Sequence, residues 1–130
     1  FIFEIREKIM GAPVEWFDIM GKDGEQLKKF YSSLFGWKIN SDNPMNYGVT
    51  DTDSGRGIGG GIATDEQGQP SVTIYITVKD INAKLKEIKT SGGSVLIERT
   101  VIPEMVTFAI FSDPDGNKIG LVEETECHDG

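Results

Sequence analysis

Four side chains that can bind a ligand or react with it alternate along two β-rich segments, residues 14–19 and 71–78. They are Trp16, Asp18, Thr73 and Tyr75. Side chains two positions apart on a strand point to the same face, so each pair faces one side of its strand. Trp16 can stack on a flat or cationic ligand. Asp18 can neutralise a cation or accept a hydrogen bond, and Tyr75 can act as a general acid or as a plain hydrogen-bond donor. The pattern indicates a binding surface on a sheet.

Two of these residues, Trp16 and Asp18, also have a structural alternative. Trp16 can simply fill space, and Asp18 can hydrogen-bond to Thr73, Thr77 or Tyr75 across neighbouring strands. Both alternatives stay open at the level of sequence.

Three apolar or aromatic residues outside these two strands are further candidates. Met105 lies in the loop of residues 102–105, where it can adapt to varied ligand shapes or plug the core. Tyr47 and Phe108 occupy matching positions in the two halves of the chain, as opposing walls of a site or as core residues.

Glycines accompany the candidate surface. Alternation along residues 57–63 places Gly59 and Gly61 on the side of Trp16, and alternation along residues 118–123 places Gly120 there. Glycine inside a strand often marks the close approach of a ligand or of backbone. The run at residues 59–61 lacks the helix and the Lys-Ser/Thr of a phosphate loop. We therefore expect a flat, open floor.

The elements that must position these residues occur twice. The strand with Lys22-Asp23 at its end is repeated by the strand that ends in Lys79-Asp80, and an amphipathic helix follows each. Asp23 and Asp80 are the expected N-caps. Three further strands follow each helix, so both halves are predicted to be β-α-β-β-β. A repeated unit of roughly 50–60 residues predicts a pseudo-two-fold fold with a cavity between the halves.

Length and composition limit the classes of function. The 130 residues suit one domain, here divided into an extension (1–11), a first module (12–63), a linker (64–70), a second module (71–124) and a tail (125–130). The formal net charge of −8 argues against a nucleic-acid partner. No apolar run reaches the roughly 18–20 residues of a membrane span. A single cysteine predicts a reducing cytoplasm.

The ordered motifs resemble one family. They are P-V-E-W-F-D-I, F-Y-S-S-L-F-G-W, I-G-G-G-I, V-K-D-I-N-A-K-L and F-S-D-P-D-G-N-K-I-G-L, spread over residues 12–124. Together they resemble the vicinal oxygen chelate superfamily, which comprises glyoxalases, bleomycin-resistance proteins and extradiol dioxygenases. The resemblance implies an α+β fold of tandem βαβββ modules, with a cup-shaped mixed sheet and helices on its outer face. It also implies a small-molecule site and a homodimer.

Enzymes of that superfamily usually hold a divalent metal through ligands on the first and last strands of each module. The resemblance places these positions at Trp16, Thr73, Gly120 and near Gly59. Indole and glycine supply no side-chain ligand, and one threonine is a poor one. The only histidine, His128, lies in the tail beside Cys127, too near the terminus for a catalytic dyad. A set of carboxylates, Asp18 with Glu15 and Glu123, is the remaining possible metal site.

These observations predict a metal-independent small-molecule binding protein that sequesters a flat or cationic compound, with no cofactor and no catalytic residue. One alternative is a lyase- or isomerase-type enzyme with an unconventional site. The other is a plugged module that serves assembly or regulation. The predicted ligand-binding residues are Trp16, Asp18, Tyr47, Gly59, Thr73, Tyr75, Met105, Phe108 and Gly120.

Overall fold

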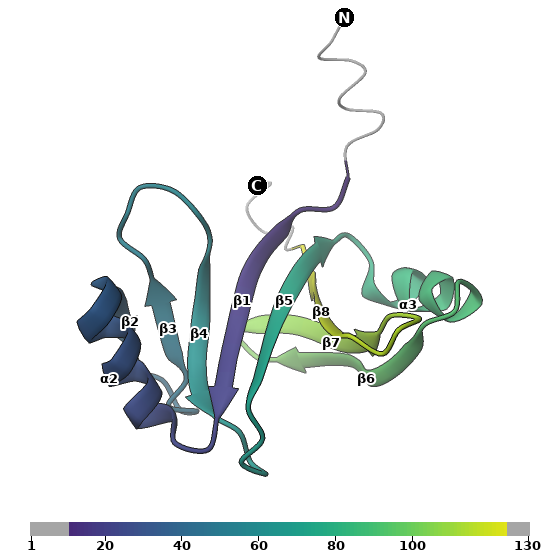
Figure 1. Ribbon diagram of the computed structural model, residues 1–130. Coiled ribbons are helices and arrows are strands. Elements are labelled where there is room, and N and C mark those ends of the chain that lie inside the picture. The colour runs from purple at the N-terminus through teal and green to yellow at the C-terminus, as the bar shows by residue number, and fades with distance from the viewer. Residues whose placement is uncertain (1–10, 125–130) are drawn as a thin grey trace, which may run out of the picture.

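The computed structural model describes residues 11–124, which form β-α-β-β-β twice (Figure 1). The first module contains β1 (Val14–Gly21), α2 (Gly24–Phe35), β2 (Lys38–Asn40), β3 (Gly48–Asp51) and β4 (Gly59–Thr64). The second contains β5 (Ser71–Val78), α3 (Ile81–Thr90), β6 (Ser94–Ile102), β7 (Val106–Ser112) and β8 (Lys118–Glu123). The predicted extension, apart from Gly11, and the predicted tail with Cys127 and His128 lie outside the described residues.

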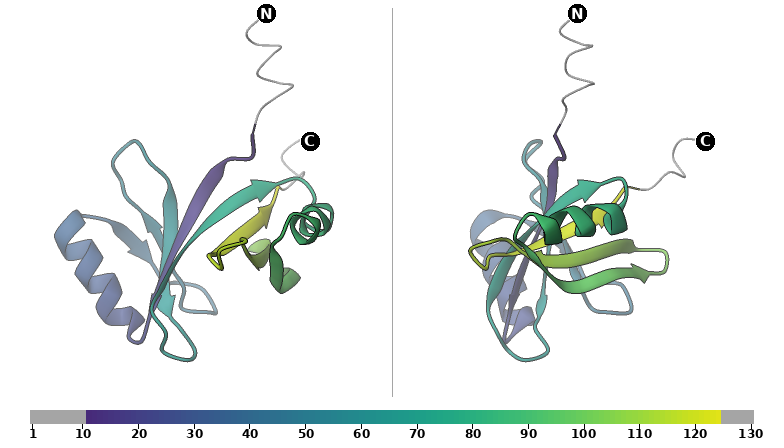
Figure 2. Two further views of the ribbon diagram at one scale, coloured as in Figure 1. Left: turned by 45° about the vertical axis from the view of Figure 1, so that its right-hand side comes forward. Right: turned by 90° about the vertical axis from the view of Figure 1, so that its right-hand side faces the viewer.

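All eight strands belong to one mixed sheet in the order β2-β3-β4-β1-β5-β8-β7-β6. β1 runs parallel to β4, and β5 runs parallel to β8. The modules join where β1 and β5 pair antiparallel, at the middle of the sheet. Helices α2 and α3 lie toward opposite ends of the molecule, each beside the strands of its own module (Figures 1 and 2). The predicted α+β fold of tandem modules is confirmed.

Both helices begin where the sequence predicts. Asp23 and Asp80 have extended backbones, and their carboxylates accept hydrogen bonds from the N–H groups of Gln26 and Ala83. These bonds satisfy donors that the first helical turn leaves free. Helix α2 ends at Gly36, whose φ of 73° is in the left-handed region that glycine tolerates.

The packed core lies between α3 and the second module's strands. Ile81 and Leu85 of α3 meet Val78, Ala109 and Leu121, all at least nine-tenths buried. Alternation thus sends Leu121 to the helix side and leaves Gly120 for the opposite, concave side, as predicted.

The aliphatic side of β5, formed by residues 72, 74, 76 and 78, is covered by a helix at one end only. Val78 is buried in the core with α3. Val72 is 71% exposed and Ile74 39% exposed, because α2 packs mainly on β4 and α3 packs on β6, β7 and β8. The join between the modules therefore presents apolar side chains to solvent.

Candidate ligand-binding site

Strand pairing gathers the predicted residues on the concave face. Trp16 lies beside Gly59 on one neighbouring strand and beside Tyr75 on the other. Tyr75 in turn lies beside Gly120 of β8. One step along β1, Asp18 lies between Gly61 and Thr73 in the same way. Two adjacent rows of the sheet therefore contain most of the predicted site.

Phe108 and Met105 lie in the outer part of the second module. Phe108 pairs with Val122 two residues beyond Gly120, so it also belongs to the concave side. Met105 lies in the turn between β6 and β7 and is 43% exposed, so the alternative that it plugs the core is wrong.

Asp18 is the centre of a hydrogen-bonded network on the concave face. The Tyr75 hydroxyl donates to Oδ2 of Asp18 across 2.7 Å, and the Tyr47 hydroxyl donates to Oδ1. The indole Nε1–H of Trp16 donates to the Tyr47 hydroxyl across 2.8 Å. The contact with Tyr75 was one of the partners expected for Asp18. The contact with Tyr47 was not, because it comes from a loop 29 residues away in sequence.

The network shifts the pKa values of its members. Burial raises the pKa of the Asp18 carboxyl, against the opposing effects of the two tyrosine hydroxyls and the charge of Lys118. Burial and the neighbouring Asp18 charge raise the pKa of the hydroxyls of Tyr47 and Tyr75 far above 10. Both tyrosines therefore stay protonated at neutral pH. This suits hydrogen-bond donation and disfavours proton release by Tyr75 as a general acid.

The concave glycines make room for the tyrosine rings. A Cβ atom added at Gly120 would fall within the ring of Tyr75, and one added at Gly61 would overlap the hydroxyl end of Tyr47. The expected open floor is therefore wrong at Gly61 and Gly120, where protein side chains occupy the space. A Cβ at Gly59 would lie 2.9 Å from the Thr50 carbonyl oxygen and 3.5 Å from the Trp16 ring.

A buried lysine holds the loop that delivers Tyr47. Lys28 of α2 is 8% exposed, and its ammonium donates to Glu25 at 2.9 Å and to the Asn46 carbonyl at 3.0 Å. Asn43 closes the same loop, because its amide binds both the N–H and the carbonyl of Tyr47. Sequence reasoning missed this arrangement. The usable signal was a lysine in the buried stripe of an amphipathic helix, since lysine is seldom buried unless paired.

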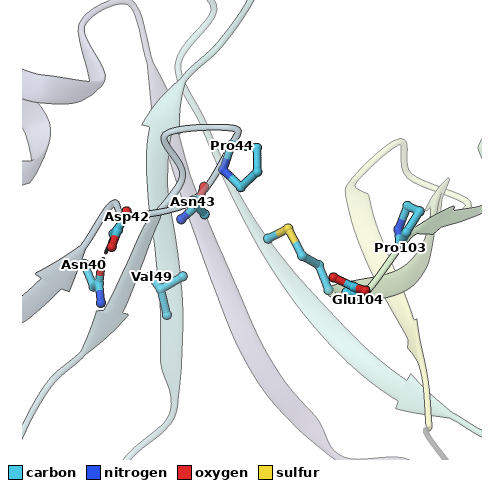
Figure 3. A pocket seen from close by; sticks show the side chains of 8 residues that line it. Asn40, Asp42, Asn43, Pro44, Val49, Pro103 and Glu104 are labelled. Atoms are coloured by element: carbon cyan, nitrogen blue, oxygen red, sulfur yellow. Dashed lines mark hydrogen bonds between the residues drawn. The ribbon is translucent and has the colours of Figure 1, made fainter.

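A hollow of about 400 Å³ opens between the loop before β3 and the turn between β6 and β7. It is linked to the network through Asn43, which lines it and binds the backbone of Tyr47. Figure 3 shows Asn43 and Pro44 on one side, and Pro103 and Glu104 on the other. Its lining residues are Asn40, Asp42, Asn43, Pro44, Val49, Pro103, Glu104 and Met105. The sequence predicted only Met105 of this set, because the hollow forms between loops of different modules.

Glu123 does not face the concave side. Its carboxylate pairs with the Arg99 guanidinium at 2.6 Å and accepts the Ile81 N–H at the start of α3 at 3.0 Å. These contacts lower the pKa of Glu123. Residues 11–124 contain no group of three His, Cys, Asp or Glu side chains suited to a metal ion.

Comparison with known proteins identifies the fold. Residues 14–121 match the model of the Glyoxalase/Bleomycin resistance protein/Dioxygenase superfamily. The chain belongs to this superfamily. Methylmalonyl-CoA epimerase from Mycobacterium tuberculosis superimposes with a TM-score of 0.65 over 92% of this chain and 95% of its own, at 17% identity. That level of identity supports likeness of fold alone.

Two curated proteins are similar to this chain in sequence. Anthracycline biosynthesis protein DauV of Streptomyces sp. strain C5 is 30% identical over 125 residues, which cover 82% of this chain and 44% of DauV. A glyoxylase-like domain-containing protein of Didymella fabae is 27% identical over 84% of this chain and 91% of its own length. The chain thus spans less than half the length of DauV. Among its described residues, no helix is long and apolar enough to cross a membrane.

The residues at the superfamily's metal-ligand positions do not fit a divalent cation. The Trp16 indole is a donor only, and its proton is already bound by Tyr47. Gly59 and Gly120 have no side chain, which leaves the neutral hydroxyl of Thr73. A divalent metal in a protein needs several oxygen, nitrogen or sulfur ligands.

Proposed function

We propose that this domain is a metal-independent small-molecule binding protein that sequesters a flat or cationic compound in its cup. The observation that supports this most directly is the network of Trp16, Tyr47, Asp18 and Tyr75. Trp16 stands at one of the expected metal-ligand positions, and the Tyr75 ring lies against another, Gly120. The network gives the floor an aromatic surface for stacking and a carboxylate for a cation.

The hollow between the loop before β3 and the turn between β6 and β7 supplies volume for a ligand. Its size of about 400 Å³ lies in the range of small-molecule sites, and Pro44, Val49, Pro103 and Met105 give it apolar contact surface. The name of one relative connects that protein with the making of anthracyclines, which are flat polycyclic compounds. An anthracycline is therefore a reasonable member of a test panel.

Two alternatives rest on particular observations. The raised pKa of Asp18 favours an enzyme of the lyase or isomerase kind, because a carboxyl with a shifted pKa is a candidate acid or base. The filling of the floor at Gly61 and Gly120 favours a plugged module that serves assembly or regulation.

We also propose a homodimer in a reducing cytoplasm. The exposed apolar residues Val72 and Ile74 support the homodimer, since an uncovered apolar patch often marks an interface.

Tryptophan fluorescence tests the proposal. The chain has two tryptophans, and Trp37 packs against Phe17 and Tyr31 on the outer face. A W37F variant therefore reports on Trp16. We expect a flat or cationic compound from the panel to quench this variant and to raise its melting temperature. W16F, which keeps Trp37, serves as the control without quenching.

Elemental analysis of the purified chain is the companion measurement, and we expect no stoichiometric divalent metal. No quenching and no thermal shift across a broad panel would count against the proposal and favour a plugged module. A stoichiometric metal would favour the enzyme.

A further inference from the structure

The hydrogen-bond donors of the network of Trp16, Tyr47, Asp18 and Tyr75 are already used within the protein. Trp16, Tyr47 and Tyr75 each have one polar hydrogen. The Trp16 hydrogen is bound by the Tyr47 hydroxyl, and both tyrosine hydrogens are bound by Asp18. What these four groups can still offer a ligand is lone pairs, on the carboxylate and on the two phenolic oxygens. The network can therefore accept hydrogen bonds from a ligand but cannot donate any.

The hollow between the loop before β3 and the turn between β6 and β7 also offers mainly hydrogen-bond acceptors. Asp42 and Glu104 line it, and neither carboxylate has a cationic partner among residues 11–124. The amide of Asn43 is engaged with Tyr47, as both donor and acceptor. Asn40 accepts the N–H of Asp42 through Oδ1, and its NH₂ group remains as a donor. Among the eight lining residues there is no lysine, arginine or histidine.

Lys118 offsets part of this negative charge. It lies two residues before Gly120 on β8, on the same concave side, and its charge acts on Asp18. Lys118 is exposed, so solvent and salt screen its charge. Lys38 lies on the same side of β2 as Asn40, and it faces Asp51 across the strands. Lys118 offsets one of the three carboxylates Asp18, Asp42 and Glu104, so this group of charges is negative on balance.

We infer that the cup takes a ligand that donates hydrogen bonds, namely an aromatic compound with an ammonium or amidinium group, and that it rejects carboxylates and phosphates. This inference rests on the proposed function and narrows it from a flat or cationic compound to a cationic one. A bound anion would face the lone pairs of Asp18 and the charges of Asp42 and Glu104 with few donors in return. A cation replaces its lost hydration with charge-assisted hydrogen bonds.

Three planar probes of similar size test the inference by calorimetry on the full chain. They are 9-aminoacridine, which is cationic at pH 7, neutral 9-hydroxymethylanthracene and anionic anthracene-9-carboxylate. We expect the cation to bind at least about tenfold more tightly than the neutral probe, the difference that one charge-assisted hydrogen bond makes. The anion is expected to bind least. Raising the salt concentration should narrow these differences.

Substitutions then show which carboxylates bind the cationic probe. Asp18→Asn is expected to weaken the binding of 9-aminoacridine by about tenfold. Asp42→Asn and Glu104→Gln are expected to weaken it by about threefold each, because the charges of Asp42 and Glu104 are more exposed. Glu66→Gln, in the exposed linker, removes one negative charge elsewhere and should leave the affinity unchanged. The Asp42 and Glu104 variants alter exposed side chains, so they test the inference even if Asp18→Asn fails to fold.

The outcomes separate this inference from the proposed function. If the neutral or anionic probe binds as tightly as the cation in a Trp16-dependent manner, the inference is overturned and the proposed function stands. The inference is also overturned if all three carboxylate variants bind 9-aminoacridine as tightly as the wild type does. If none of the three probes binds, the inference is overturned, and the broader panel decides the proposed function.

Discussion

Gly120 and Tyr75 should be energetically coupled, because one side chain occupies the space that the other residue lacks. In Gly120→Ala the new Cβ would fall within the Tyr75 ring, so the ring must move. Overpacking of this kind costs about 1–3 kcal/mol. Alanine also lowers the backbone entropy lost on folding, which returns about 0.5–1 kcal/mol. The net expected destabilisation is about 0–2.5 kcal/mol.

The same substitution should change sign when Tyr75 is absent. In a Tyr75→Ala background the clash is gone and only the entropic gain remains, so Gly120→Ala should stabilise the protein by about 0.5–1 kcal/mol. The coupling energy of the double-mutant cycle is then about 1–3 kcal/mol. Urea unfolding of the four proteins measures it, provided that the denaturant slopes agree.

Tyr31 supplies the matched control. It packs on Trp37 and Phe35 on the outer face of the sheet, with rings 5.3 and 6.1 Å apart. A cycle of Gly120→Ala with Tyr31→Ala should be additive within about 0.5 kcal/mol. Equal destabilisation by Gly120→Ala with and without Tyr75 would show that the two residues are not coupled. In that event a contact other than the Tyr75 ring would cause the destabilisation by Gly120→Ala.

Three further outcomes follow from the same contacts. Lys28→Met should destabilise the protein by about 1–3 kcal/mol in urea unfolding and move the Trp16 indole N–H resonance, because it releases the loop that holds Tyr47. Lys84→Met, which breaks an exposed pair of the same i,i+3 spacing, should cost at most about 0.5 kcal/mol. Asp18 has a raised pKa, so its contribution to stability is complete below its ordinary value of 3.8 and is lost as the pH rises through its folded pKa. Asp18→Asn should therefore gain stability relative to the wild type as the pH rises through this window, measured by urea unfolding at several pH values. Glu123 has a lowered pKa and must behave oppositely, so the cost of Glu123→Gln should be greatest near neutral pH and shrink as the pH falls below 4.5. Equal pH profiles for the two variants would contradict both assignments.

The concave face was predictable because strand alternation is strict. Once residues 14–19 and 71–78 are assigned to strands, Trp16 and Asp18 must share a face, and so must Thr73 and Tyr75. The repeat then predicts that the two faces adjoin. The hydrogen bond between Asp18 and Tyr75 follows from this arrangement.

The loop contribution was not predictable in the same way. Tyr47 precedes β3 rather than lying within it, so no alternation fixes the direction of its side chain. Its position depends on Lys28 and Asn43, which act through tertiary contacts and side-chain hydrogen bonds. The exposure of Val72 was missed for a related reason. Alternation gives the face of a strand but does not tell whether a helix covers it.

Calorimetric titration of a cationic planar compound in the presence of EDTA tests whether the cup binds its ligand without a metal. We expect the same affinity, within about twofold, in EDTA and after addition of Mg²⁺, Mn²⁺ or Zn²⁺, because we propose that the network of Trp16, Tyr47, Asp18 and Tyr75 binds the ligand directly. Binding that disappears in EDTA and returns with one of these cations would contradict it.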